Sequence, residues 1–225
     1  MELVVIKTMK KTILFILFTL SINAVFADSP LTSTNFYQAY LNVPIVAKTA
    51  NSNGVLTDEV FDYLNSTTSS IDKKIAVINA LKWKIEGKNN ATLYLKKLMF
   101  LHKDYTPTAF YNLANADELI CYAYLKAMDN YFDVKEASLF SAQALKRNPK
   151  SYTIAIVNQL IVLQMLLNRQ NEWCEVYHSM NNIRENKDLI VDFRKEASTI
   201  IFNYTDKYKE NCTVWHSIKK FLKGN

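Results

Sequence analysis

Scarcity of glycine is the feature that most restricts the fold of this chain, which has only three glycines in 225 residues. Proteins carry about 7% glycine on average, and the tight turns between β-strands depend on this residue. A chain built mainly of β-strands is therefore disfavoured, and we expect an all-α fold. Hydrophobic residues make up 49% of the chain, which excludes the disordered class because such a chain can bury a core.

The first 27 residues have the pattern of a bacterial secretory signal peptide. Lys10 and Lys11 form a basic start, residues 13–20 form an apolar centre, and Val25 and Ala27 stand at positions −3 and −1 of a cleavage site. The apolar centre is shorter than the roughly 20 residues that cross a membrane, which disfavours an uncleaved anchor. No cysteine lies near the cleavage site, so a lipoprotein is disfavoured. We expect an exported protein, periplasmic or secreted, with no stable membrane span after cleavage.

Residues 28–225 are expected to form a single α-helical domain. Apolar residues recur at helical spacing in about ten or eleven segments with short connections. The weakest point is a seam near residues 103–108, where Pro107 interrupts the pattern. The segment 151–167 is apolar on all sides, which is typical of a buried helix. The clearest expected helices span residues 34–41, 57–64, 71–86, 89–102, 117–130, 133–147, 151–167, 172–183, 189–204 and 214–222.

The net charge of the chain gives no indication of a nucleic-acid-binding protein. It is +6 for the whole chain and falls to +4 without the three lysines and one glutamate of the signal peptide. Nucleic-acid binding requires a clustered basic face, and here the charges are interspersed. The one basic cluster, Lys219, Lys220 and Lys223, falls at the end of the last expected helix, where positive charge complements the helix dipole.

One segment resembles a known family of helical repeats. The motif reads Ala137-x3-Ser141-x2-Ala144-Leu145 and is followed by Asn148-Pro149. With the helix before it, this motif resembles a degenerate tetratricopeptide repeat over about 33 residues, 117–149, although Ser141 stands where that family has an aromatic residue. The resemblance implies antiparallel helical hairpins stacked into an α-solenoid-like array that binds a protein or peptide. An irregular helical bundle is the alternative fold.

Two Cys-x3-His pairs are the most distinctive chemical feature of the sequence. Cys174 and His178 share one expected helix, and Cys212 and His216 share another. On a helical wheel both cysteines fall on the flanks of their helices and both histidines point further outward. We favour a disulfide between Cys174 and Cys212, which suits an exported protein. The alternatives are a zinc site of all four residues, or unrelated thiols and solvent-facing histidines. The third cysteine, Cys121, is expected to be a buried free thiol.

The catalytic motifs that a single sequence can identify are missing from this chain. There is no glycine-rich phosphate loop, no His-Glu-x-x-His and no Gly-x-Ser-x-Gly. No catalytic residue and no cofactor is therefore predicted, which favours a non-enzyme. The leading hypothesis is an exported, non-enzymatic interaction or scaffold protein of the bacterial cell envelope that binds a protein or peptide partner.

Two alternative functions remain open at this stage. A carrier of an apolar ligand is suggested by the apolar helix 151–167, and a zinc-dependent enzyme by the Cys/His pairs. Aromatic residues near Pro107, namely Tyr105, Phe110 and Tyr111, form either an exposed binding cluster or a packed corner between helices. The sequence assigns no binding residues, partner identity or oligomeric state.

Overall fold

The computed structural model describes residues 29–167 and 173–212, and within these ranges it contains eleven α-helices, two 3-10 helices and no β-strand. The predicted all-α class is thus confirmed, whereas the predicted signal peptide, residues 1–27, and the last expected helix, 214–222, lie outside the described residues. The α-helices are α2 (Pro30–Ser33), α3 (Pro44–Ala50), α4 (Asp58–Asn65), α5 (Ile71–Ala80), α6 (Asn90–Leu101), α7 (Pro107–Leu113), α8 (Ala116–Asp129), α9 (Lys135–Arg147), α10 (Tyr152–Leu167), α11 (Trp173–Glu185) and α12 (Lys195–Thr205). The 3-10 helices are η2 (Phe36–Tyr40) and η3 (Asp206–Tyr208).

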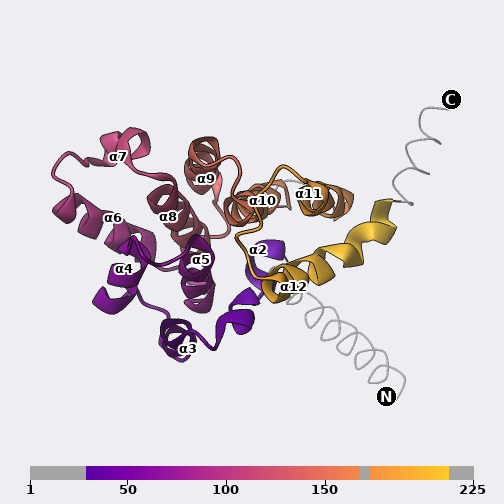
Figure 1. Ribbon diagram of the computed structural model, residues 1–225, viewed down its shortest axis with the longest axis horizontal. Helices are drawn as coiled ribbons and strands as arrows, with labels where there is room; N and C mark the ends of the chain where they lie inside the picture. The colour runs from indigo at the N-terminus through magenta and orange to yellow at the C-terminus, as the bar shows by residue number, and fades with distance from the viewer. Residues whose placement is uncertain (1–28, 168–172, 213–225) are drawn as a thin grey trace, which may run out of the picture.

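Helices α8 to α11 each pack on the next helix along the chain, with α6 and α7 toward one end of the molecule and α11 and α12 toward the other (Figure 1). Helix α12 departs from this order, because it returns to pack on η2 and α2. At that contact the backbone N–H of Arg194 donates to the Tyr40 hydroxyl at 3.0 Å, and the Arg194 guanidinium donates to the Ala39 carbonyl at 2.7 Å. The N-terminal and C-terminal parts of the described chain therefore meet.

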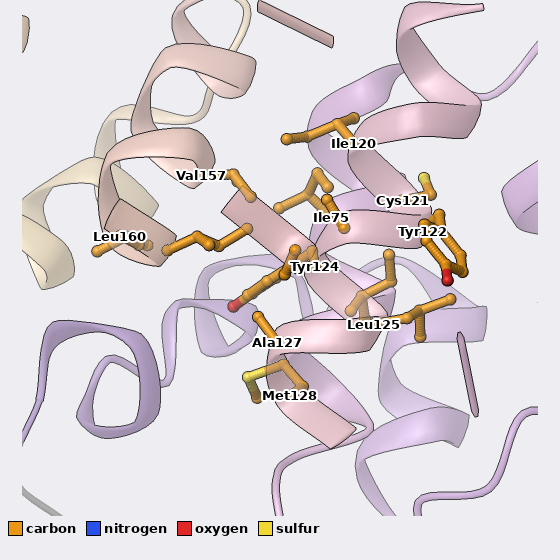
Figure 2. Close-up of a cluster of buried hydrophobic side chains, with 14 of the residues drawn as sticks. Ile75, Ile120, Cys121, Tyr122, Tyr124, Leu125, Ala127, Met128, Val157 and Leu160 are labelled. Carbon is orange, nitrogen blue, oxygen red and sulfur yellow. The ribbon is translucent and has the colours of Figure 1, made fainter. Parts of the chain in front are cut away.

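The core centres on α8 and α10. Helix α8 buries 11 of its 14 residues and α10 buries 10 of 16, as expected for a helix that is apolar on all sides. Figure 2 shows side chains of α8 meeting Ile75 of α5 and Val157 and Leu160 of α10. The Tyr124 hydroxyl accepts a hydrogen bond from the Asn79 side chain at 2.9 Å, so this buried polar pair is satisfied. Cys121 is a buried free thiol, as predicted.

Two of the expected helices are shorter in the structure. Helix α5 stops at Ala80 instead of continuing to residue 86, and Lys82 adopts a left-handed backbone with φ of 60°. Ile85, which falls inside the expected helix 71–86, lies beyond the end of α5 and is 61% exposed. Helix α12 begins at Lys195 instead of residue 189, because the backbone of Ile190 pairs with the strand-like segment around Ser151 and leaves the helical path.

The segments around Pro44 and in α6 complete the description of the helices. Pro44, which follows the expected helix 34–41, is the first residue of α3, a position where its fixed φ and missing N–H cost little. The residues before it form the 3-10 helix η2, in which only Phe36 and Tyr40 are buried. In α6 the core contacts come from Tyr94 and Leu98, while Leu101 at the end of the helix is half exposed.

Candidate functional site

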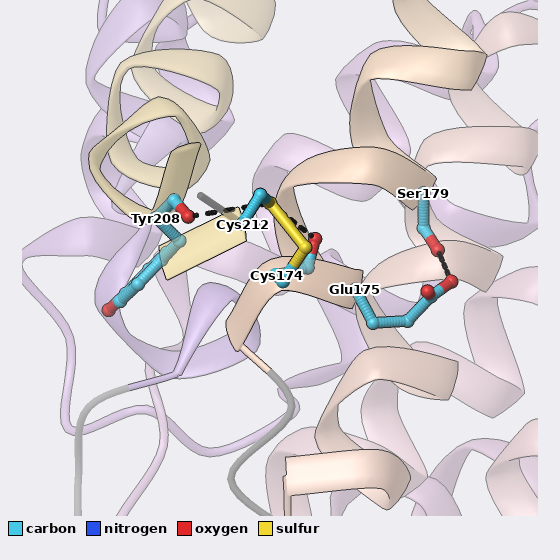
Figure 3. Close-up of a disulfide and its surroundings, with 5 residues drawn as sticks. All are labelled: Cys174, Glu175, Ser179, Tyr208 and Cys212. Atoms are coloured by element: carbon cyan, nitrogen blue, oxygen red, sulfur yellow. Dashed lines mark hydrogen bonds between the residues drawn. A yellow bond between two sulfur atoms is a disulfide. The ribbon is translucent and has the colours of Figure 1, made fainter. Parts of the chain in front are cut away.

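The structure joins Cys174 and Cys212 in a disulfide, the pairing favoured by the sequence (Figure 3). Cys174 is the second residue of α11, and Cys212 lies four residues after η3. Their Cα atoms are 4.8 Å apart, within the range that an unstrained disulfide allows. The bond links α11 to the end of the described chain across a sequence separation of 38 residues.

His178 lies beside this disulfide, as its i, i+4 spacing from Cys174 requires. A ring nitrogen of His178 and the two sulfur atoms all lie within 4.8 Å of one another. The imidazole is exposed, whereas Cys174 is half-buried and Cys212 is buried. His216, the fourth member of the zinc alternative, lies outside the described residues. In the disulfide the sulfur atoms are bonded to each other, so neither is the thiolate that zinc binds.

The other polar and aromatic groups around the disulfide are occupied by neighbours. Glu175 accepts a hydrogen bond from the Ser179 hydroxyl at 2.6 Å, and Figure 3 shows its carboxylate turned away from the sulfur atoms. The rings of Trp173 and Tyr208 stack at 4.3 Å and brace the same junction between α11 and η3. The disulfide, its neighbouring histidine and this aromatic pair thus form one compact centre.

A second candidate site, which the sequence did not indicate, is a pocket of about 470 Å³ lined by residues 84–89 and 129–132. Two loops form it, and hydrogen bonds hold them together: the Lys88 N–H donates to the Asp129 carbonyl at 3.0 Å, and the Ala91 N–H donates to the Asp129 carboxylate at 2.7 Å. Gly87 has a φ of 79°, and a Cβ at this position would lie 3.1 Å from the Asp129 carbonyl oxygen. A glycine is therefore required where the loops approach.

Burial changes the titration of two charged groups in this pocket. It raises the pKa of Asp129 to about 6, even though the hydrogen bond from Ala91 acts in the opposite direction. Burial also lowers the pKa of Lys88 to about 8, and its ammonium donates to the carbonyls of Leu81 and Lys82 at the end of α5. Both side chains therefore have a structural role: Asp129 caps the N-terminus of α6, and Lys88 caps the C-terminus of α5.

The pocket exposes two large apolar side chains among polar and charged ones. The ring of Tyr131 packs on the ring of Trp83, with centroids 4.8 Å apart, and on the ring of Phe132, with centroids 4.2 Å apart. These three aromatic residues form a cluster at the pocket. Two of the residues that line the pocket are exposed apolar side chains: Ile85 is 61% exposed and Phe132 is 49% exposed. Gly87 was the one sequence signal for this site, because it marks a turn, but a single sequence does not show which distant loop that turn meets.

The aromatic residues near Pro107 form a packed corner between helices. Phe110 is fully buried against the rings of Tyr105 and Tyr122. The Tyr105 hydroxyl donates to Glu118 at 2.8 Å, and Glu118 also completes the capping box at the start of α8. The structure therefore agrees with the packed corner and not with the exposed binding cluster.

Comparison with known proteins adds no functional information: no protein-family model, no curated protein and no solved structure matches this chain. Within the described ranges, 29–167 and 173–212, no helix combines the length and the apolar character needed to cross a membrane.

Proposed function

We propose that this chain is an exported, non-enzymatic helical protein of the bacterial cell envelope that binds a protein or peptide partner through the pocket of residues 84–89 and 129–132. The observation that carries the proposal is a pair of exposed large apolar side chains, Ile85 and Phe132, on two loops that are fixed by hydrogen bonds. Large apolar side chains exposed on a rigid frame are typical of binding surfaces, because little conformational entropy is lost when a partner covers them.

The two charged groups of the pocket whose pKa is shifted, Asp129 and Lys88, favour binding over catalysis. A general acid or base must reach the reacting group, but Asp129 is buried and hydrogen-bonded to the start of α6, and Lys88 is held by two carbonyls. The exposed residues of the pocket include polar and charged side chains, such as Lys84 and Glu86, and two large apolar ones, Ile85 and Phe132. These two apolar side chains are the ones that we expect a partner to contact. They suit an apolar or aromatic side chain of a partner, which would insert between Ile85 and Phe132.

Two further features bear on the choice of function. The hairpin of α8 and α9 carries the tetratricopeptide-like motif, and its small residues Ala137, Ser141 and Ala144 are fully buried, which is consistent with the close helix approach of such repeats. Helix α10, which suggested an apolar-ligand carrier, packs against α2, α8, α9 and α11. We therefore prefer a surface pocket to a ligand held along α10.

A site-specific photo-crosslinker placed at residue 132 tests this proposal in the cells that produce the protein. Two matched positions serve as controls because each is a more exposed apolar residue away from the pocket: Phe100 (75% exposed) and Val191 (77% exposed). We expect one reproducible protein adduct from position 132, lost when Ile85→Asp is added, and no such adduct from positions 100 and 191. Equal adducts from all three positions, or none from position 132, would contradict the proposal.

A further inference from the structure

The disulfide centre contains three groups that can bind a metal ion once the sulfur–sulfur bond is broken. Cys174, Cys212 and His178 already hold their ligand atoms within 4.8 Å of one another. Around a tetrahedral zinc ion, with bonds of about 2.3 Å to sulfur and 2.0–2.1 Å to nitrogen, neighbouring ligand atoms lie closer than about 4 Å. Only a small adjustment of side chains therefore separates the observed arrangement from a coordination shell.

Contacts other than the disulfide also bring the backbone of these ligands together. Cys174 and His178 lie one turn apart on α11, so their relative position is fixed by the helix itself. Cys212 is held near α11 by the stacked rings of Trp173 and Tyr208 and by the ion pair between Arg184 of α11 and Asp206 of η3 at 2.8 Å. These contacts remain after reduction and favour the return of the two thiols to the same place, even though the reduced end of α11 opens more often.

We propose that the reduced form of this centre is a zinc site with Cys174, Cys212 and His178 as protein ligands. Zinc favours thiolate and imidazole ligands, and three protein ligands with one water is a common arrangement. Glu175 is not a ligand, because its carboxylate is held by Ser179 on the other side of the helix. The exposed side of His178 gives the ion an entry path.

The redox step balances with a dithiol as the reductant. The dithiol gives two electrons and two protons to the Cys174–Cys212 bond, so the protein gains two thiols and the dithiol becomes a disulfide. Zinc then displaces both thiol protons and binds two thiolates and the neutral imidazole of His178. Zinc and the disulfide therefore compete for the same sulfur atoms: metal binding protects the thiols from oxidation, and oxidation releases the metal.

Zinc titration of the full mature chain tests this inference, using protein prepared without a histidine tag and a chromophoric chelator as the competitor. We expect about one zinc per reduced chain and almost none per oxidised chain, as a site of two thiolates requires. Binding to the reduced chain should release up to about two protons per zinc ion near neutral pH, since free thiols are mostly protonated there. A surface site of carboxylates and histidines would bind equally in both redox states.

Histidine variants identify the third ligand. His178→Ala should weaken zinc binding by at least about tenfold, the smaller of the losses seen when even an outer partner of a ligand is removed. His102→Ala is the matched control, because His102 is also solvent-accessible but lies beside Glu118, in another part of the fold. Unchanged affinity in His178→Ala, or an equal loss in His102→Ala, would overturn the assignment of His178.

The zinc titration remains a test of the proposal if reduction partly unfolds the helices. Circular dichroism of the reduced chain, recorded with and without zinc, reports its helical content. If the reduced chain loses helix, added zinc should restore it, because binding to the three ligands is coupled to folding. A reduced chain that binds no zinc, whether its helices remain or are lost, would overturn the proposal.

Discussion

Helices α8 and α11 have similar lengths and are attached to the molecule in opposite ways. Helix α8 buries 11 of 14 residues, whereas α11 buries only Val176 and Met180 among its 13. Helix α11 is instead held by the Cys174–Cys212 disulfide near one end and by Arg184 near the other. The difference shows that a helix can keep its place with little buried surface when crosslinks replace the core.

The energies of the two kinds of attachment explain this division. Fully burying an apolar side chain contributes about 1.5–3 kcal/mol, so two such residues supply about 3–6 kcal/mol before the cost of ordering the helix is subtracted. A disulfide that closes a loop of this length contributes roughly 3–4 kcal/mol in the entropic model. The crosslink is thus comparable to all the apolar burial of α11, while in α8 any single contact is one of many.

The largest expected loss of stability comes from removing a buried side chain of α8. Tyr124→Ala removes a fully buried ring and leaves the Asn79 amide without that partner, so we expect a loss of about 4 kcal/mol or more in the free energy of unfolding. Urea unfolding followed by circular dichroism measures this loss. The control Leu139→Ala, at a position that is 56% exposed, should change stability by less than about 0.5 kcal/mol.

Removal of the disulfide should have the next largest effect. Cys174→Ser or Cys212→Ser should lower the stability of the oxidised chain by roughly 3 kcal/mol and lower its melting temperature. Cys121→Ser should lower it less and leave the disulfide intact, because Cys121 is a free thiol in the core. Thiol counting on denatured, unreduced protein should find one free thiol. Three free thiols in protein isolated without reductant would contradict the pairing.

The third prediction concerns the pH dependence of stability that results from burying the Asp129 carboxyl group. Its folded pKa is about 6 against an ordinary value of 3.8, so the folded state binds the proton more tightly than the unfolded chain. This contribution to stability is present below pH 3.8 and is lost as the pH rises through 6, a change of about 2–3 kcal/mol. Unfolding of wild type and Asp129→Asn at pH 4 and pH 7 measures it, and the variant should lack this part of the pH dependence. Identical pH dependence in both proteins would show that Asp129 does not titrate as described.

The smallest effect concerns the ion pair that holds the far end of α11. Arg184 donates two hydrogen bonds to Asp206 of η3 and lies 4.8 Å from the ring centre of Phe202 in α12. Both charged side chains are partly exposed, so Arg184→Met should cost no more than about 1 kcal/mol. Thermal unfolding of the oxidised chain detects such a change. A loss as large as that of Cys174→Ser would show that the ion pair, rather than the disulfide, holds α11.

Sequence reasoning succeeded where local chemistry alone decides the structure. The expected helix 57–64 begins at a threonine, a residue type typical of N-caps, and the Thr57 hydroxyl accepts from the Val60 N–H at the start of α4. The segment 151–167 was expected to be a buried helix because it is apolar on every side, and α10 spans Tyr152–Leu167. The disulfide followed from two cysteines on helix flanks in a chain expected to be exported.

Sequence reasoning failed where a distant segment decides the structure. The residues around Ile85 and Ile190 have helical apolar spacing, but the first belongs to a loop tied to Asp129 and the second pairs through its backbone with the segment around Ser151. The pocket was missed for the same reason, because its two halves come from loops that meet only in the fold. Apolar periodicity reports a preference for burial, and it does not say which partner is available.

Hydrogen exchange with and without a dithiol reductant tests the central claim most directly, namely that the disulfide holds α11 while burial holds α8. Reduction in a zinc-free buffer should speed amide exchange in Trp173–Glu185 and leave exchange in Ala116–Asp129 nearly unchanged, because local opening reflects the contacts of each helix. Equal acceleration in both helices, or no change in α11, would contradict the account.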